Sequence, residues 1–140
     1  MSTPFSVFLR GLRVRSALSQ AELARKIGYE QAYISALELG TKPPSAEFLT
    51  RLRDRLSLAD ADQQEMQIEL QNSPRRIVIP ADLPTDEYRM WAELNQKMGR
   101  LLPTQIETVR AVVRMDEEMA ARPRYGFPRV RRKSKEGTEM

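Results

Sequence analysis

The 140-residue sequence contains no cysteine and no histidine. Without cysteine, disulfide bonds and thiolate metal sites are excluded. Without histidine, the chain lacks the commonest general base and the commonest metal ligand of proteins. The sequence also offers no nucleophile–base pair, no cluster of metal-ligating residues and no glycine-rich phosphate loop. We therefore expect a protein that is not an enzyme and that binds no cofactor and no metal ion.

Long hydrophobic runs are absent as well. No stretch approaches the roughly 18 apolar residues that a membrane-spanning helix requires. Arginines interrupt residues 1–15, so we expect no signal peptide. These observations predict a cytoplasmic protein that does not associate with a membrane. The formal net charge of +4 favours a polyanionic partner.

Helical patterning dominates residues 1–72, which we predict to form one domain. A first helix is expected over residues 4–16, because apolar side chains recur there at three- and four-residue steps. Ser19 and Glu22 have the spacing of a capping box, so a second helix begins there and ends at Gly28. The apolar positions of these two helices are Phe5, Phe8, Leu9, Leu12, Ala21, Leu23, Ala24 and Ile27.

Three more helices complete this domain. One is expected over residues 30–39, because Gly40 and the prolines that follow it cannot continue a helix. Ser45 caps the next helix, and the last is expected over residues 60–71. Their apolar positions are Phe48, Leu49, Leu52, Leu56, Met66, Ile68 and Leu70. The two short helices that meet at Gly28 form a helix-turn-helix, whose second helix can enter the major groove of DNA.

Residues 73–84 are expected to be a linker or a short edge strand. The β-prone run Ile77-Val-Ile79 is closed by Pro80, and a strand next to proline is easiest at the edge of a sheet. Such a strand could pair with its copy in a second subunit.

Residues 85–121 are predicted to form a helical dimerisation or packing region. A stripe at helical spacing contains Tyr88, Trp91, Leu94, Met98 and Leu101. Pro103 opens another helix, whose apolar side contains Ile106, Val109, Val112 and Val113. Two helices alone bury too little surface to be stable, so they pack within the chain or form a dimer interface. We prefer the dimer interface.

Residues 122–140 are rich in arginine and lysine and include Pro123 and Pro128. We expect a disordered basic tail. Such a tail is either a solubilising end or an arm that adds phosphate or minor-groove contacts.

The ordered series of motifs over roughly residues 5–70 resembles the lambda-repressor/Cro-like (XRE) helix-turn-helix family. The matching segments are Leu18-Ser-Gln-Ala-Glu-Leu-Ala, Ile27-Gly, Tyr33-Ile-Ser, Leu37-Glu-Leu-Gly and Pro44-Ser. The resemblance implies an all-α protein with a five-helix DNA-binding domain that binds double-stranded DNA as a homodimer. A C-terminal helical hairpin, with the possible short strand between, and the basic tail would follow this domain.

The resemblance also implies roles for individual residues. Gln20 matches a glutamine that bonds a phosphate and braces the recognition helix, and Gln31 matches a base-reading position. Arg13 and Glu38 match an ion pair between the first and third helices. The neighbouring groove-facing positions are Glu30, Ala32 and Ser35, and the loop that touches the DNA backbone contains Thr41 and Lys42.

Chemistry supports some of these roles and leaves others open. Gln31 offers the donor and acceptor pair that adenine needs, and Glu30 could accept from cytosine. Tyr33 either stacks on the DNA backbone or packs inside the domain. Arg10 and Lys42 are candidate phosphate ligands or ordinary solvated cations.

Three departures from the family pattern stand out. Ser16-Ala17 replaces the usual glycine after the first helix, Tyr29 occupies a position where a small capping residue is common, and Glu30 would repel phosphates.

Together these features predict a dimeric, sequence-specific transcriptional regulator, a repressor that occludes a promoter by binding a palindromic operator. The alternative is an antitoxin-type interaction module. In it, residues 76–121 hold a partner protein and the helix-turn-helix only regulates its own gene.

Overall fold

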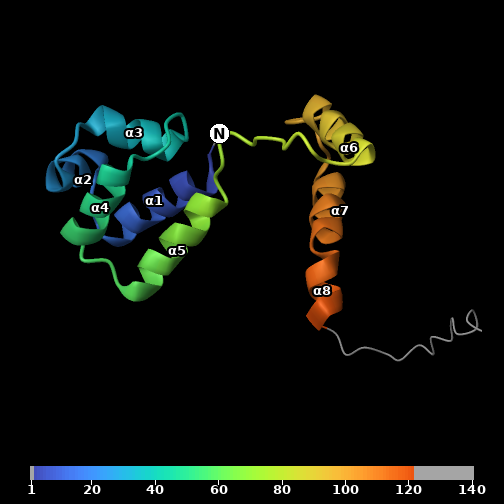
Figure 1. Ribbon diagram of the computed structural model, residues 1–140. Coiled ribbons are helices and arrows are strands. Elements are labelled where there is room, and N and C mark those ends of the chain that lie inside the picture. Colours follow the sequence, from blue (N-terminus) through green and yellow to red (C-terminus); the bar gives the residue numbers. More distant parts are fainter. Residues whose placement is uncertain (1, 122–140) are drawn as a thin grey trace, which may run out of the picture. The chain divides into compact units, whose positions relative to one another are not determined.

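The computed structural model describes residues 2–121, which divide into two compact units. The first unit ends at Ile79 and the second begins at Pro80. The described residues are helical, without a strand, which confirms the predicted all-α fold (Figure 1). The basic tail lies outside the described residues.

The first unit is a five-helix domain, as the sequence predicts. Its helices are α1 (Pro4–Arg15), α2 (Gln20–Ile27), α3 (Gln31–Leu39), α4 (Ala46–Arg55) and α5 (Asp60–Gln71). They pack around a core to which every helix contributes. The core side chains are Phe5, Phe8, Leu9, Leu12, Leu23, Ala24, Ile27, Ile34, Leu37, Phe48, Leu52, Leu58 and Met66. Ile68, expected on the apolar side of α5, is instead 56% exposed.

The boundaries of α2 follow from local signals in the sequence. Ser19 and Glu22 form the predicted capping box, in which each side chain accepts from the other residue's backbone N–H. Gly28 ends α2 in the left-handed conformation, with φ of 88°. Gly40 ends α3 in the same way, and Ser45 caps α4. These caps set the angles between the short helices.

The turn between α1 and α2 shows the consequence of the missing glycine. Ala17 occupies the left-handed region there, with φ of 58°. This conformation is disfavoured for any residue with a Cβ atom. Arg13 supports the turn, since its Nη1 donates to the Leu18 carbonyl at 2.9 Å.

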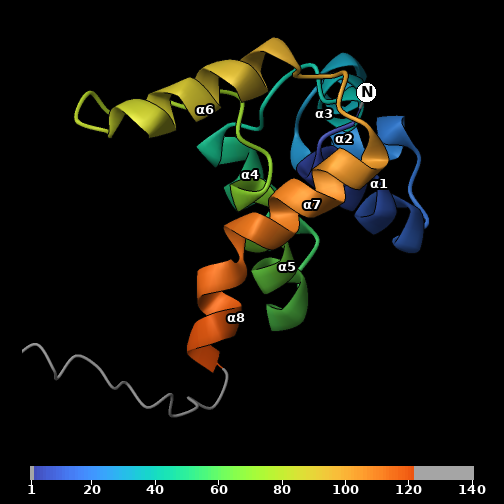
Figure 2. The ribbon, with the colours of Figure 1, turned by 90° about the vertical axis from the view of Figure 1, so that its right-hand side faces the viewer.

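The second unit contains α6 (Thr85–Gln96), α7 (Pro103–Val113) and α8 (Met115–Ala121). Pro103 opens α7, as expected. The view in Figure 2 shows α8 following directly after α7. The separate helix α8 was not anticipated by the apolar pattern.

Of the two alternatives for residues 73–84, a linker or a short edge strand, the strand is wrong. Ile77-Val-Ile79 forms no strand: its side chains are exposed and its backbone has no partner strand in residues 2–121. The apolar stripe through Leu101 is also not one continuous helix face, because α6 ends at Gln96 and Gly99 turns the chain with φ of 81°. Met98 consequently lies in the connection and is 70% exposed.

Candidate functional site

The first turn of α3 presents the residues that were expected to face a groove. Gln31 and Ala32 are exposed, and Ser35 is half-buried one turn further on. The opposite side of α3 faces the core through Ile34 and Leu37. The structure therefore brings the predicted groove-facing residues together on one side of one helix.

The backbone at the start of α3 is also open. Glu30 is the N-cap residue, is exposed and makes no side-chain hydrogen bond to the helix. The first N–H groups of a helix have no partner within the helix, and a capping side chain normally accepts from one of them. Without that cap, the N–H groups of Gln31 and Ala32 remain available to an external acceptor, and the helix dipole favours a negative one.

A polar network that includes the buried carboxylate of Glu38 connects α3 to α1. The Arg13 guanidinium donates to the Glu38 carboxylate through Nε at 2.6 Å and Nη2 at 3.1 Å. This confirms the predicted ion pair. The side chain of Glu38 is only 4% exposed, and that of Arg13 is 14% exposed. The hydrogen bond to Glu38 raises the pKa of Arg13 above its ordinary value, although burial opposes the shift.

Gln20 joins this network from the first turn of α2. Its Nε2 donates to Oε1 of Glu38 at 3.1 Å, so Gln20 links α2 to α3. An amide nitrogen carries two hydrogens, and only one is used in this bond. Gln20 is half-buried, so its amide is held by Glu38 while part of the side chain remains accessible.

An aromatic cluster fixes the turn where the sequence departs from the family pattern. Tyr29 stacks on Tyr33 with ring centroids 4.9 Å apart, and both rings meet Phe48 edge-on at 5.4 and 5.5 Å. The Tyr33 hydroxyl accepts from the backbone N–H of Ser45 at 3.2 Å. The turn before α3 is thus held by ring packing in place of a capping side chain. Tyr33 has both ring and hydroxyl engaged within the domain.

Two arginines of α4 contribute contacts that sequence patterns did not indicate. Arg51 donates from Nη1 to the carbonyls of Ile27 and Gly28, each at 3.3 Å, and its guanidinium lies 5.2 Å from the Tyr29 ring centroid. Arg55 donates to the Lys26 carbonyl at 3.0 Å. Both satisfy carbonyls at the end of α2. No local signal reveals such caps, because the partners are 23 to 29 residues apart.

The remaining candidates lie just after the end of α3 and in the middle of α1. Thr41 is exposed, but its hydroxyl donates to the Ala36 carbonyl at 3.1 Å and so closes the end of α3. Lys42 is exposed, with its Nζ 6.0 Å from the Tyr33 ring centroid. Arg10 is exposed on α1, one turn before Arg13, and residues three apart share a helix face. Arg10 therefore lies on the side of α1 that faces α3.

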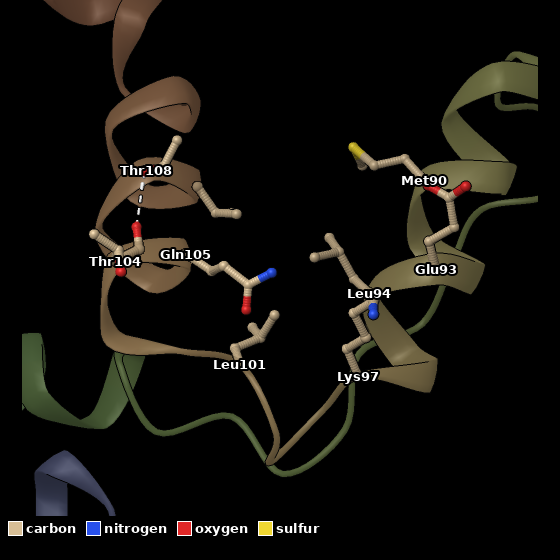
Figure 3. A pocket seen from close by; sticks show the side chains of 9 residues that line it. Met90, Glu93, Leu94, Lys97, Leu101, Thr104, Gln105 and Thr108 are labelled. Carbon is tan, nitrogen blue, oxygen red and sulfur yellow. Dashed lines mark hydrogen bonds between the residues drawn. The ribbon is translucent and has the colours of Figure 1, made fainter.

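The second unit contains a pocket of about 420 Å³ between α6 and α7. Figure 3 shows Leu94 of α6 and Gln105 of α7 pointing toward one another across it. Other lining residues are Met90, Glu93, Lys97, Leu101, Thr104, Thr108 and Val109. None of the described residues of this unit is buried, so the unit presents an apolar surface without a core.

Neither a metal centre nor a membrane segment is found in residues 2–121. The acidic side chains there form no group of three that could hold a metal ion. None of the helices described combines the length and apolar character needed to cross a bilayer.

Comparison with known proteins finds a similarity within the first unit. Residues 4–66 match a family model described as a helix-turn-helix domain. No curated protein and no solved structure matches the chain. The matched residues cover all of α1 to α4 and the first half of α5, which includes the exposed start of α3 and the network behind it. Residues 4–66 are therefore similar to helix-turn-helix domains, in agreement with the resemblance to the lambda-repressor/Cro-like regulators.

Proposed function

We propose that this chain is a sequence-specific DNA-binding transcriptional regulator in which α3 enters the major groove. The observation that carries the proposal is the open first turn of α3. It combines exposed Gln31 and Ala32, uncapped backbone N–H groups and a rigid support through Arg13 and Glu38. An α-helix fits the major groove, and a fixed helix is needed to present side chains to base edges in one register.

Individual residues take different parts in this proposal. Gln31 reads an adenine through its amide, and Glu30 accepts from a cytosine amino group. Ala32 and Ser35 have small side chains that allow a close approach or contact a thymine methyl group. Gln20 uses its second amide hydrogen on a phosphate while Glu38 holds the first.

The other predicted contacts go to the DNA backbone. Lys42 and Arg10 neutralise phosphates, and Thr41 holds the loop at the end of α3 so that Lys42 is presented beside it. Tyr33 supports this surface from within the aromatic cluster and has no direct contact with DNA.

The active form is a homodimer that occludes a promoter at a palindromic operator. Two recognition helices must be about 34 Å apart to occupy successive major grooves. The apolar face of α6 and α7 supplies the interface, because its unburied side chains need a cover. A second copy suits this face electrostatically: the first turn of α6 carries Asp86 and Glu87, whereas the end of α7 carries Arg110 and Arg114.

The test of DNA recognition is selection of bound sites from a random duplex pool, followed by titration. We expect one enriched palindrome. Gln31→Ala then costs roughly 1–3 kcal/mol at that site and little on random DNA. Gln67→Ala, an exposed glutamine on α5, is the matched control and leaves both affinities unchanged. Equal losses on both DNAs would remove Gln31 from base reading, and a pool without enrichment would overturn sequence-specific binding.

The dimer is tested separately by light scattering. The full chain is expected to be a dimer and residues 1–79 a monomer. Leu94→Asp in the full chain should also yield a monomer, because the carboxylate would have to be buried in the interface. Glu93→Asp, a conservative change on the same pocket, keeps the dimer. If residues 1–79 are dimeric by themselves, the interface lies in the first unit instead.

A further inference from the structure

The chain that leaves α5 returns to the end of α3. The Ser73 hydroxyl accepts from the backbone N–H of Phe5 at 2.8 Å and donates to the Glu69 carbonyl at 2.6 Å. Two residues later, the Arg75 guanidinium donates from Nη1 to the Gly40 carbonyl. These contacts connect residues separated by 68 and 35 positions. The segment 73–76 is therefore fastened to the helix-turn-helix domain, although it lies beyond the part that matches the family model.

This return places cations beside the α3–α4 loop. Lys42 and Arg75 line the same small hollow, together with Thr3, Pro43 and Pro44. Arg76 follows directly and is exposed, as are Lys42 and Arg75. Within residues 2–121, none of the three cations takes part in an ion pair.

The sequence around these cations contains no acid that would neutralise them. Residues 1–21, 39–46 and 70–81 contain neither aspartate nor glutamate. By contrast, the arginines of α4 that form ion pairs, Arg51 and Arg53, have Glu47 and Asp54 as partners. The cluster of Lys42, Arg75 and Arg76 thus combines unpaired positive charge with a side chain, that of Arg75, which is held in place by the Gly40 carbonyl.

We propose that Arg75 and Arg76, with Lys42, form a phosphate-binding site that extends the DNA contact beyond the helix-turn-helix domain. This inference rests on the proposed function, since the expected ligand is the DNA backbone next to the base pairs that α3 reads. The bond to Gly40 uses one of the five N–H donors of Arg75 and orients the rest. Oriented donors lose less side-chain entropy when they bind a phosphate than the donors of a free surface arginine.

The experiment measures the salt dependence of DNA binding by the full chain. Each phosphate contact contributes about 0.9 to the slope of log K against log salt concentration. Arg76→Gln is therefore expected to lower the magnitude of the slope by about 0.9, and Arg75→Gln with Arg76→Gln by about 1.8. Affinity should fall by the same factor on the selected site and on random duplex, because phosphates carry no sequence information.

The control removes the same charge elsewhere. Arg15→Gln with Arg53→Gln also deletes two arginines, but each of these is already paired with an aspartate. The control variant should keep the slope of the wild-type chain. An equal drop in the control would show a general charge effect and would overturn the site.

Two further outcomes distinguish a failure of the phosphate site from misfolding of a variant and from a failure of the proposed function. Arg76→Gln leaves the Arg75 bond to Gly40 intact, so an unchanged slope in this variant overturns the role of Arg76 without any ambiguity about folding. If the wild-type chain shows no salt-dependent DNA binding, the proposed function fails. If it binds and the double variant keeps its slope, only the phosphate site fails.

Discussion

The two units of this chain differ in what holds them together. In the first unit, apolar residues from all five helices meet in one core, and the buried Glu38 carboxylate is paired with Arg13. In the second unit, helices begin and end at local signals such as Pro103, yet no described side chain is buried. A local signal such as Pro103 can thus start a helix, but only packing gives a unit its own stability.

This difference separates two functional roles. A unit with its own core can hold Gln31 and Gln20 in fixed positions whether or not a partner is present. A unit without a core gains stability from whatever covers it, so its folding depends on concentration or on a partner. The regulator we propose would therefore couple dimer assembly to the folding of α6 and α7, while the DNA-reading surface stays preformed.

The largest effect is expected when the two units are produced as separate chains and their stabilities are compared. Residues 1–79 should unfold cooperatively, whereas residues 80–140 should have little helix when dilute and gain it as their concentration rises. Burying each Met, Leu or Val side chain in an interface contributes roughly 1.5–3 kcal/mol, which the dilute monomer lacks. Far-UV circular dichroism over a concentration series measures this. Cooperative, concentration-independent unfolding of residues 80–140 would contradict the conclusion that the second unit is not stable by itself.

The next prediction concerns the buried pair behind α3. Arg13→Ala should lower the free energy of unfolding of residues 1–79 by roughly 3 kcal/mol, because it leaves the Glu38 carboxylate buried without a cation. The control is Arg15→Ala, which removes an ion pair with Asp62 at 3.5 Å on the surface. Exposed pairs contribute less than about 1 kcal/mol. Urea unfolding distinguishes the two variants, and equal losses would mean that the buried pair has no special importance.

Much of the first unit was predictable because residues next to each helix end show where the helix begins or ends. Ser19 and Glu22 are three residues apart, and Gly28 and Gly40 each stand directly after the helix that they end. The predicted limits of the fifth helix coincide with α5. Apolar periodicity likewise placed most of the core, since a helix that packs on one side repeats every three to four residues.

The contacts that complete the candidate site were not predictable in this way. Arg51 reaches the end of α2, and Arg75 reaches the end of α3, across 23 and 35 residues. Both side chains look like ordinary surface cations in the sequence. Only the tertiary arrangement reveals that they satisfy helix carbonyls. The departure at Tyr29 was visible in the sequence, but its partners Tyr33 and Phe48 were not.

The second unit was predicted least well because no core constrains it. The apolar stripe from Tyr88 to Leu101 has helical spacing throughout, yet Gly99 takes a left-handed conformation and the helix stops at Gln96. A periodic pattern states which face is apolar. It does not state how far the helix continues when nothing packs against that face.

Exchanges between glycine and alanine give a smaller effect whose sign depends on backbone conformation. Ala17→Gly should stabilise residues 1–79 by about 0.5–1 kcal/mol, because it relieves a left-handed alanine. Gly11→Ala should stabilise α1 by about 0.5–1 kcal/mol, because alanine has a higher helix propensity than glycine. The added Cβ would have no neighbouring atom within 4 Å. Thermal unfolding of both variants measures the gain.

Gly28→Ala is the contrasting variant and should destabilise the domain. Its φ of 88° is disfavoured for alanine, and the added Cβ would lie 2.9 Å from Nη1 of Arg51. Moving Arg51 away would weaken its bonds to the carbonyls of Ile27 and Gly28. A loss of stability in Ala17→Gly, or a gain in Gly28→Ala, would refute the assignment of strain to these turns.

The smallest expected effect contrasts the charged cap of α2 with the neutral one of α7. Glu22 accepts from the Ser19 backbone N–H at 2.7 Å, whereas Gln105 accepts from the Leu102 N–H at 2.8 Å. The backbone hydrogen bond from Ser19, aided by the Ser19 hydroxyl, lowers the pKa of Glu22 below its ordinary value. A lowered pKa in the folded state contributes stability above the unfolded-state pKa of about 4.3, and this stability disappears as the pH falls.

Glu22→Gln should therefore make the cap of α2 behave like that of α7. The variant is expected to be slightly less stable than the wild-type residues 1–79 at neutral pH, and the difference should be smaller at about pH 3, because the stability from the carboxylate is lost as the pH falls toward its lowered pKa. Ser45→Ala removes a cap without a carboxylate, so its cost of about 1 kcal/mol should be the same at both pH values. Urea midpoints at the two pH values measure both variants. A difference between Glu22→Gln and wild type that does not change with pH would mean that the carboxylate charge adds nothing to the cap, and that charged and neutral caps are equivalent in the two units.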